Sequence, residues 1–564
     1  MEKIKTFYKD KTNLCNCLLL AIISIVGWLF FKGHYANIMT DVGREMLFSE
    51  AVLKGNVLYK DILCIYFPLA YQLNALAYLI FGTTIQTLEL CGLFNITLFV
   101  LSLYLLSENF LDKKISFLIS VTTLFVSVYH GTLFNMILPY STGFTYGLTT
   151  SAFAILFAIK YTKTNKFYFL VLAYLFSGIA FTFKGEYGLI LPIMIYLSFW
   201  AKPCNIKENC INIVAFSIIP ALSLSILFLQ GLSFNDIISA AEFMKTFFST
   251  EAMIYHLGMT GGIFTFGKFS LYGTTIFNLL IFYGTAIFLY SKTKNTKLLW
   301  IAALICAFFL NSTKVWIHTV FIPITLFVLL VWKFKSIKTN LPLMILTLSA
   351  IALTVRMFWS LVLSIYGLYT APIAIIALIV LLIEFLPKQT KLSVEDIKKF
   401  SIFALSCYLI YFFVFDFFQR QTNNTKISTP KGTVYLPQRE ATCLNNAIKY
   451  IQSNTTENQK VLILQEGMAL NFLTDRKVDL NMPMVDRLYY EAIGEDKIIE
   501  NLKKNNYDVI FIAEGFGLTN FGKPFLYGSD NAILRYIFKN YNLEWRNNFV
   551  KRGIDNNLFC LRHK

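Results

Sequence analysis

Charged residues are scarce in this chain, and their shortage limits what it can be. Only 15% of the 564 residues are Asp, Glu, Lys or Arg, whereas 56% are hydrophobic and 16% are aromatic. Soluble domains carry about 25% charged residues, so most of this chain is expected to lie in lipid. Acidic residues are scarcer than basic ones, which gives a net charge of +17. The lysines stand in short loops between apolar runs rather than in a basic stripe, which argues against a nucleic-acid partner.

The sequence also lacks the motifs of several common sites. No C-x-x-C pair has a matching histidine or cysteine partner, which argues against a structural zinc site. The GFG at 515–517 lacks the spacing of a phosphate-binding loop, and no Ser-His-Asp or Cys-His signature is present. Most of the ten cysteines lie in apolar runs, where a thiol behaves as a small hydrophobe. Cys443 and Cys560 lie in a polar region and are able to pair if it faces an oxidising compartment.

What the chain has in abundance is apolar runs of spanning or near-spanning length, about thirteen in all. No small-residue cleavage site follows the first run, so we expect a retained span rather than a signal peptide. The runs lie at roughly 15–32, 87–107, 115–130, 145–160, 167–182, 186–200, 210–230, 273–290, 298–311, 315–332, 341–358, 368–386 and 400–418.

The basic loops predict how these spans are oriented. Four lysines precede the first span, so the N-terminus should be cytoplasmic. Lysine-rich loops then occur between later spans, and they share one side only if the apolar stretch 62–82 does not cross the bilayer. We therefore expect 33–86 to be one external loop, with part of it lying along the membrane as interfacial helices. A second long external loop is expected at 231–272. The lysine-rich loops lie at 113–114, 160–166, 202–207, 292–297, 333–338 and 388–399.

The composition changes after residue 418. Asn, Lys, Asp and Glu become common, and no run is long enough to span. The stretches VLILQ (461–465) and DVIFIA (508–513) indicate buried strands, with helical periodicity between them. We therefore predict an α-helical polytopic membrane domain over 1–418 and an extracytoplasmic α/β domain over 419–564. The chain would lie in the cytoplasmic (inner) membrane, in contact with its lipid.

The stretch 41–82 places charged groups among aromatics beside lipid, which is costly unless the groups have a function. Asp41 is the strongest candidate in it, because a carboxylate at the boundary between water and lipid can act as a general base. Asp41 is equally suited to cap the helix expected to start at Val42. Arg44 lies one helical turn on and can pair with Asp41.

Five further polar residues fall on the predicted outer side. Lys60, Lys314, His318 and Arg356 are able to hold a phosphate in a low-dielectric setting. For Lys60 and Lys314 a lysine that only reaches the membrane surface is an equal alternative. Glu186 stands between two spans with little polar cover, where its alternatives are a catalytic role and a purely structural pair with Lys184.

The stretch 41–82 contains a spaced pattern of small, aromatic and charged residues. The pattern is Asp41-x-Gly43-Arg44, Gly55-x-x-Leu58-Tyr59-x-Asp61, Tyr66-x-Pro68-Leu69-x-Tyr71 and Phe81-Gly82. It resembles the first external loop of GT-C glycosyltransferases. Among these it is most similar to bacterial relatives of the protein O-mannosyltransferases and of the lipid A aminoarabinose transferase. Looser matches are FKGEYGLILP (183–192) and KVWIHTVFIP (314–323).

The resemblance implies transfer of a sugar from a polyprenyl-phosphate donor to a glycan, lipid or protein acceptor of the cell envelope. It implies an inverting reaction with Asp41 as the general base. Relatives often carry a second acidic residue in the loop after the third span, but 131–144 contains none. Either Glu186 replaces it from the next outer loop, or acceptor binding differs. The span 15–32 and its neighbours would hold the lipid tail.

The remaining residues of the predicted site shape the loop or contact substrate. No metal site is predicted, although Asp41, Glu45 and Glu186 leave a divalent cation open. These loop-shaping or substrate residues are Arg44, Glu45, Tyr59, Asp61, Tyr66 and Pro68.

Two other classes compete with an enzyme. A transporter or flippase for lipid-linked sugars also needs many spans and cations, but no repeat symmetry between halves is evident. An O-antigen-type polymerase shares the donor chemistry but not the pattern around Asp41.

Overall fold

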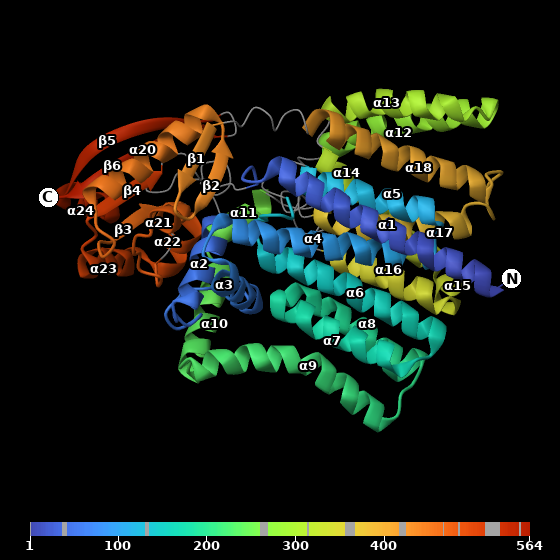
Figure 1. The fold of residues 1–564 in the computed structure, drawn as a ribbon, viewed down its shortest axis with the longest axis horizontal. Coiled ribbons are helices and arrows are strands. Elements are labelled where there is room, and N and C mark those ends of the chain that lie inside the picture. Colours follow the sequence, from blue (N-terminus) through green and yellow to red (C-terminus); the bar gives the residue numbers. More distant parts are fainter. Residues whose placement is uncertain are drawn as a thin grey trace.

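A helical bundle with a small domain at one end makes up the computed structural model (Figure 1). The N-terminus lies at the far end of the bundle, and the C-terminus lies in the small domain. The structure describes residues 2–35, 42–129, 135–259, 269–312, 315–355, 367–416, 425–465, 467–482, 485–513, 531–551 and 554–564.

The described parts of all thirteen predicted runs are helical. The helices are α1 (Glu2–Phe31), α4 (Ile85–Ser107), α5 (Lys113–Leu124) with η1 (Phe125–Tyr129), α6 (Thr142–Thr164), α7 (Phe167–Phe183), η2 (Gly185–Ile190) with α8 (Leu191–Tyr196) and η3 (Leu197–Ala201), α9 (Ile206–Leu229), α12 (Phe269–Thr293), α13 (Thr296–Ser312), α14 (Val315–Trp332), α16 (Leu341–Thr354), α17 (Gly367–Phe385), and α18 (Val394–Tyr411) with η7 (Phe412–Asp416).

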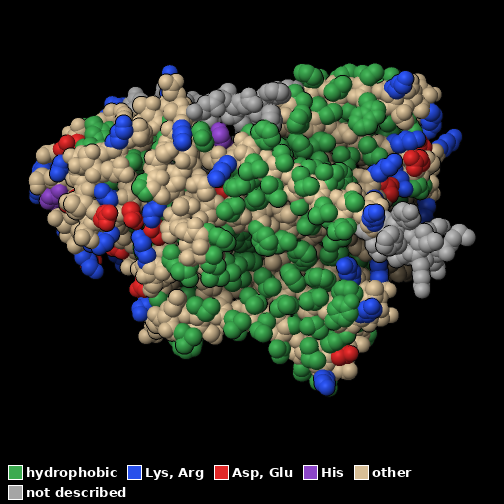
Figure 2. Space-filling model, in the orientation of Figure 1, with side chains coloured by type: hydrophobic (Ala, Val, Ile, Leu, Met, Phe, Trp, Pro, Cys, Tyr) green, Lys and Arg blue, Asp and Glu red, His purple; other side chains and the backbone are tan. Residues whose placement is uncertain are grey.

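The bundle is built to sit in lipid. Within the described residues, seven helices are long and apolar enough to cross a membrane, and six shorter apolar helices accompany them. Hydrophobic side chains cover the face of the bundle, while lysines and arginines gather at its right-hand end and on the small domain (Figure 2). The chain is therefore an integral membrane protein.

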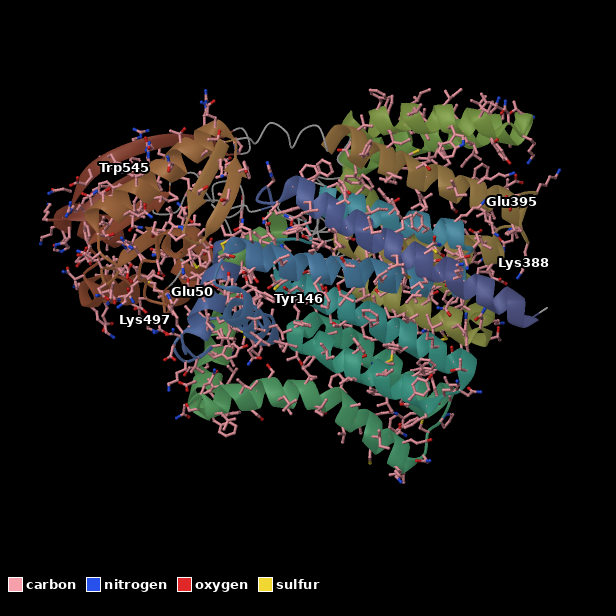
Figure 3. All side chains as sticks on the ribbon, viewed as in Figure 1. Glu50, Tyr146, Lys388, Glu395, Lys497 and Trp545 are labelled. Carbon is pink, nitrogen blue, oxygen red and sulfur yellow. The ribbon has the colours of Figure 1, made fainter. Side chains whose placement is uncertain are left out.

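The lysine-rich loops lie together at the end of the bundle away from the small domain. The Lys163 ammonium donates to the Asn109 carbonyl at 2.7 Å. Ion pairs join Lys398 to Asp112 at 3.2 Å and Lys294 to Asp396 at 3.3 Å. Lys388 and Glu395 stand at this same end in Figure 3. Which side of the membrane this end faces stays a prediction.

Four helices lie at the opposite end, beside the small domain, and a short helix lies among the lysine-rich loops. The first group is α2 (Val42–Leu53), α3 (Leu69–Phe81), α10 (Phe234–Phe248) and α11 (Glu251–Met259); the short helix is α15 (Phe334–Thr339). Helix α3 starts after Pro68, which fixes the backbone at its N-cap. It exposes Leu73, Leu76 and Leu79, as a helix lying along the membrane surface would.

The small domain holds the two predicted strands in one sheet. Its elements are β1 (Thr425–Thr429), β2 (Gly432–Leu436), α20 (Gln438–Asn454), β3 (Val461–Leu464), α21 (Ala469–Thr474), α22 (Arg487–Ile493), α23 (Glu495–Asn505), β4 (Val509–Ala513), α24 (Ala532–Asn540), β5 (Tyr541–Lys551) and β6 (Ile554–His563). The sheet order is β3-β4-β6-β5, with β3 and β4 parallel and the other pairs antiparallel. Cys443 and Cys560 are free buried thiols, so they do not form the disulfide considered above.

The β1–β2 hairpin fastens this domain to the bundle. The Tyr435 amide donates to the Gly33 carbonyl at 3.0 Å, beyond the end of α1. The Ile85 amide, at the start of α4, donates to the Lys431 carbonyl at 2.8 Å. One cluster of buried hydrophobic side chains continues from the bundle into the domain. The two parts therefore share a core at this junction.

Candidate functional site

Helix α2 carries two charged residues of the predicted site into the interior. Glu45 is 1% exposed, and its Oε2 accepts hydrogen bonds from the Thr142 amide at 3.2 Å and from the Thr142 hydroxyl. Thr142 is the first residue of α6, where the helix dipole favours a negative charge. The Glu45 carboxylate therefore ties α2 to the start of α6.

Arg44 joins three segments that are distant in the sequence. It is 1% exposed, and its guanidinium donates to the Tyr66 hydroxyl at 2.9 Å, to the Tyr140 carbonyl at 3.3 Å and to Glu45 at 3.2 Å. The guanidinium also lies over the Tyr66 ring, 4.2 Å from its centroid. A planar guanidinium suits this combination of stacking and hydrogen bonding. Arg44 thus fixes α2 against the loop that follows it and against the segment before α6.

The loop between α2 and α3 is held by its own side chains. The Tyr59 hydroxyl donates to the Tyr66 carbonyl at 2.7 Å, and the Asp61 carboxylate accepts from the Val57 amide at 2.9 Å. Tyr59 has a φ of 71°, a left-handed conformation that costs energy for a tyrosine. Burial raises the pKa of the Cys64 thiol to about 12, so it stays protonated near neutral pH and is a poor nucleophile.

Lys60 connects this loop to the end of α9. Its ammonium is exposed and donates to the carbonyl of Gly231 at 3.0 Å, just past the end of α9. This contact joins the two predicted external loops, 33–86 and 231–272.

The short η2 helix brings a second acidic group, Glu186, to the same end of the bundle. Its carboxylate lies 3.7 Å from the Lys184 ammonium, and both side chains are partly exposed. The Lys184 ammonium also lies 4.8 Å from the centroid of the Phe144 ring, in the first turn of α6. The ring of Phe67 closes over Gly185 so tightly that a Cβ there would meet it at 3.0 Å. The structure therefore places η2 against the first loop and the start of α6.

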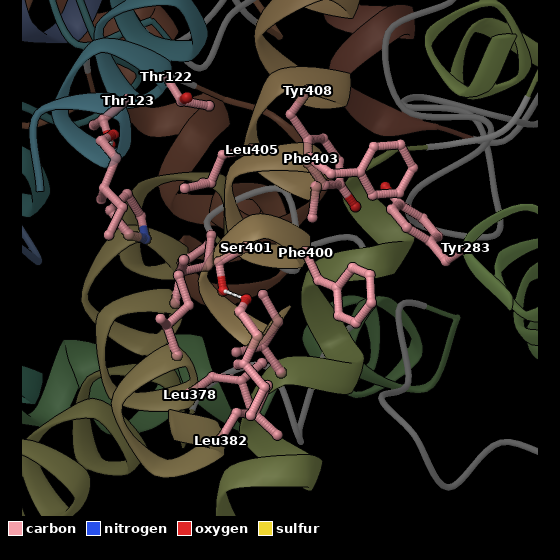
Figure 4. Close-up of a pocket in the computed structure, with 18 of the residues that line it drawn as sticks. Thr122, Thr123, Tyr283, Leu378, Leu382, Phe400, Ser401, Phe403, Leu405 and Tyr408 are labelled. Carbon is pink, nitrogen blue, oxygen red and sulfur yellow. Dashed lines mark hydrogen bonds between the residues drawn. The ribbon is translucent and has the colours of Figure 1, made fainter. Parts of the chain in front are cut away.

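A large apolar cavity lies among α5, α12, α14, α17 and α18, with a volume of about 430 Å³. It follows α17 from Leu368 to Leu382 and Leu386. Figure 4 shows Thr122 and Thr123 of α5 facing it, with Tyr283 and Tyr408 on another side. The Ser401 hydroxyl in its wall is satisfied by the Ile397 carbonyl at 2.9 Å. None of residues 15–32 lines this cavity, and the place expected above for a lipid tail stays a prediction.

Two aromatic rings lie between the Leu368 end of this cavity and the Lys184–Glu186 pair. Tyr369 stands beside the lining residue Leu368, and its ring packs on Phe144 with centroids 5.6 Å apart. Phe144 in turn lies under the Lys184 ammonium. One continuous series of contacts therefore runs from the apolar cavity to the Lys184–Glu186 pair.

No protein-family model matches this chain, and no curated protein matches its sequence. Several solved structures match its fold, among them the following two. ArnT from Cupriavidus metallidurans, bound to undecaprenyl phosphate, has a TM-score of 0.50 at 10% identity over 96% of this chain and 97% of that one. The Archaeoglobus fulgidus oligosaccharyltransferase in its apo form has a TM-score of 0.50 at 13% identity over 90% of this chain and 70% of that one. The fold is that of the GT-C glycosyltransferases.

Several residues predicted for a GT-C site lie beyond what the structure describes. Asp41, Lys314 and Arg356 fall outside the described residues, and His318 is described only by its place in α14. Among the described residues, no group of three or more His, Cys, Asp or Glu side chains could hold a metal ion. The divalent cation considered for Asp41, Glu45 and Glu186 therefore stays open.

The sequence reasoning missed two features of this candidate site. It treated Lys184 only as a partner of Glu186, although the sequence KGE already places a cation beside the acid. It also gave Glu45 no connection to Thr142, because nothing in the sequence relates positions 97 residues apart.

Proposed function

We propose that this protein is a membrane glycosyltransferase that moves a sugar from a polyprenyl-phosphate carrier to an acceptor. The observation that carries the proposal is the apolar cavity along α17, whose Leu368 end is linked to Lys184 through the rings of Tyr369 and Phe144. A carrier with a long apolar tail and a charged head needs an apolar site for the tail and a cationic site for the head. The GT-C fold supports the same conclusion, as analogy at the level of fold.

In this proposal the tail of the carrier enters the cavity between α5, α17 and α18. Its lining is aliphatic and aromatic, with few polar side chains, and apolar groups gain free energy by packing there. The remainder of a long tail would stay in the surrounding lipid. The position beside residues 15–32 expected from the sequence stays a separate prediction.

The phosphate of the carrier would lie beyond the Leu368 end of the cavity, beside Lys184. A charge-assisted hydrogen bond from an ammonium to a phosphate is strong in a partly dry site. Lys314, His318, Arg356 and Lys60 are the further cations proposed for this phosphate. Together they would stabilise the charge that develops on the leaving phosphate.

Asp41 is the proposed general base. The acceptor hydroxyl oxygen attacks the anomeric carbon of the sugar in line, and its proton passes to the Asp41 carboxylate. The bond from the anomeric carbon to the phosphate oxygen breaks, and its electron pair stays on the polyprenyl phosphate. The configuration at the anomeric carbon inverts. Glu186 is proposed to orient the acceptor, and the reaction would take place on the outer face of the cytoplasmic membrane.

Replacing Lys184 by glutamine tests the phosphate site. Loss of one hydrogen bond to a charged group costs about 1.5–3 kcal/mol, so we expect the affinity for undecaprenyl phosphate to fall about 10- to 100-fold. The affinity for undecaprenol, which has the same tail without the phosphate, should not change. Binding of both lipids is measured by native mass spectrometry of the purified protein.

The matched control is Lys166→Gln, which removes an exposed lysine at the other end of the bundle. It should bind both lipids as the wild type does. If Lys184→Gln binds the two lipids as the wild type does, the phosphate does not lie at Lys184.

Replacing Ala371 by phenylalanine tests the tail site. Ala371 lines the cavity and is 5% exposed, so a ring there would fill part of the space for the tail. We expect the affinities for undecaprenyl phosphate and for undecaprenol to fall together, by about tenfold or more. Thermal unfolding of the variant checks that overpacking, which costs about 1–3 kcal/mol, leaves the protein folded.

The control for this change is Ala221→Phe, on an exposed position of α9. It adds the same ring where only lipid surrounds it. Wild-type affinity of a folded Ala371→Phe variant for both lipids would show that the tail binds elsewhere.

A further inference from the structure

A cluster of four charged side chains joins helix α2 to the C-terminal domain. Its members are Glu50, Lys54, Lys431 and Asp475. Glu50 of α2 has a side chain only 4% exposed, and its carboxylate lies 2.7 Å from the Lys431 ammonium and 2.9 Å from that of Lys54. Both lysines also reach Asp475 of the C-terminal domain, at 3.5 and 3.3 Å. Glu50 stands at this junction in Figure 3.

The two lysines are not equivalent. Lys54 has a side chain 58% exposed, whereas that of Lys431 is 13% exposed and lies over the ring of Phe472, 5.2 Å from its centroid. An exposed ion pair contributes little because water screens it. A buried carboxylate that loses its buried partner is left poorly compensated. Lys431 is therefore the main partner of Glu50.

Asp475 completes the cluster. Burial opposes ionisation of its carboxyl group, but Lys431 and Lys54 outweigh this and lower its pKa below the ordinary value. Asp475 is thus ionised at neutral pH, and the cluster holds two positive and two negative groups. The Lys431–Glu50 and Lys54–Asp475 pairs form only when α2 and the C-terminal domain are in contact.

A second contact between the two domains lies at the start of α2. A Cβ on Gly43 would overlap the backbone nitrogen of Ala469, so α2 and α21 touch there through their backbones. Met468 packs into the cluster that contains Leu47 and Phe48. The C-terminal domain therefore meets α2 both at Gly43 and at Glu50.

The two contacts bracket the charged residues of the candidate site. Arg44 and Glu45 lie between Gly43 and Glu50 on one helix of 12 residues. A helix rises about 1.5 Å per residue, and hydrogen bonds between successive turns hold its backbone together. A short helix therefore moves as one unit when one of its ends is displaced. A shift of α2 at Glu50 would therefore move Arg44 and Glu45.

We propose that the C-terminal domain positions α2 for sugar transfer and that Lys431 is the positioning residue. Lys431 does not contact substrate in this account; it acts through Glu50. The proposal gives the C-terminal domain a role in the chemistry of the first loop. It rests on the proposed function for its effect on turnover, but not for its effect on α2.

The first experiment needs no substrate. Hydrogen–deuterium exchange is measured by mass spectrometry on the full-length protein in detergent, for wild type, Lys431→Met and Lys431→Arg. We expect amide exchange over residues 42–53 to become about tenfold faster in Lys431→Met. Exchange in β3 and β4 should stay at the wild-type rate, and Lys431→Arg should restore most of the protection of α2. The matched control is Lys426→Met, an exposed lysine on β1 of the same hairpin, which should behave as wild type.

The second experiment measures turnover of a radiolabelled polyprenyl-phosphate sugar pool in membranes. Lys431→Met should lower kcat about tenfold or more and leave the KM for the donor within twofold, because the carrier site along α17 is untouched. Lys431→Arg should recover most of the loss. A substitution that only reduced the amount of folded protein would also lower the apparent kcat. In that case Lys431→Arg would not restore the protection of α2 from exchange.

Two results would overturn the proposal. One is unchanged exchange over residues 42–53 in Lys431→Met. The other is faster exchange of α2 with wild-type kcat, while Asp41→Asn is inactive in the same assay. If Asp41→Asn itself retains full turnover, the proposed function fails, and the exchange result still decides whether Lys431 holds α2.

Discussion

Replacing Asp41 by asparagine should lower the rate of donor consumption by about 10²- to 10⁴-fold, the usual contribution of a general base. Asparagine has nearly the same shape as aspartate but cannot take up the proton of the acceptor hydroxyl. The rate is measured as loss of label from the polyprenyl-phosphate sugar pool, at matched protein levels. Binding of undecaprenyl phosphate should not change.

This substitution separates the two roles that the sequence leaves open for Asp41. Asparagine caps a helix about as well as aspartate, so a residue that only caps α2 would tolerate the change. The control is Asp496→Asn, in the exposed first turn of α23, which should retain full turnover. An active Asp41→Asn enzyme would restrict Asp41 to the capping role.

Replacing Arg44 by methionine should destabilise the folded protein by about 3–5 kcal/mol, the cost of breaking a buried charge pair by removing one partner. The change also removes the hydrogen bonds to Tyr66 and Tyr140. Folded proteins are stable by only about 5–15 kcal/mol, so much of this margin would be lost. The midpoint of thermal unfolding in detergent and the monodisperse fraction in gel filtration measure the effect.

A double-mutant cycle with Glu45→Leu isolates the pair from the rest of the site. If the Arg44–Glu45 contact at 3.2 Å is energetically coupled, the double variant should lose less than the sum of the two single variants. Lys426→Met is the surface control and should change stability by less than about 1 kcal/mol, because its side chain is exposed. Wild-type stability of Arg44→Met would mean that Arg44 does not hold α2 in place.

The sequence alone predicted the helices and strands well, for physical reasons. Long apolar runs have few alternatives to a helix in lipid, and lysines mark one set of loops. This is why α3 could be assigned to the first loop although it is apolar. The strands β3 and β4 are short apolar runs between polar helices, and both were found within about one residue.

The contacts of the candidate site were much harder to predict. Glu45 binds the start of α6 through Thr142, and Arg44 binds Tyr140, both about a hundred residues away in the sequence. Such pairs depend on how helices pack, which hydrophobic periodicity does not specify. For the same reason the sequence did not reveal the cavity along α17, and the expected place of the lipid tail beside the first span stays a prediction.

The role of the C-terminal domain was also beyond sequence reasoning. The close approach of Gly43 to Ala469 joins residues in different domains, and the local composition around them does not indicate it. The pair of Lys431 with Glu50 looks in the sequence like two ordinary surface charges. Only the fold shows that both contacts act on the helix that follows Asp41.

The most direct test of the account follows the fate of a radiolabelled polyprenyl-phosphate sugar in membranes that contain wild type or Asp41→Asn. The account predicts that wild type releases the sugar from its carrier, that the label appears in an acceptor, and that the variant leaves the donor intact. The contradicting result is a donor that stays intact with wild type but moves across the bilayer, which would make the protein a translocator.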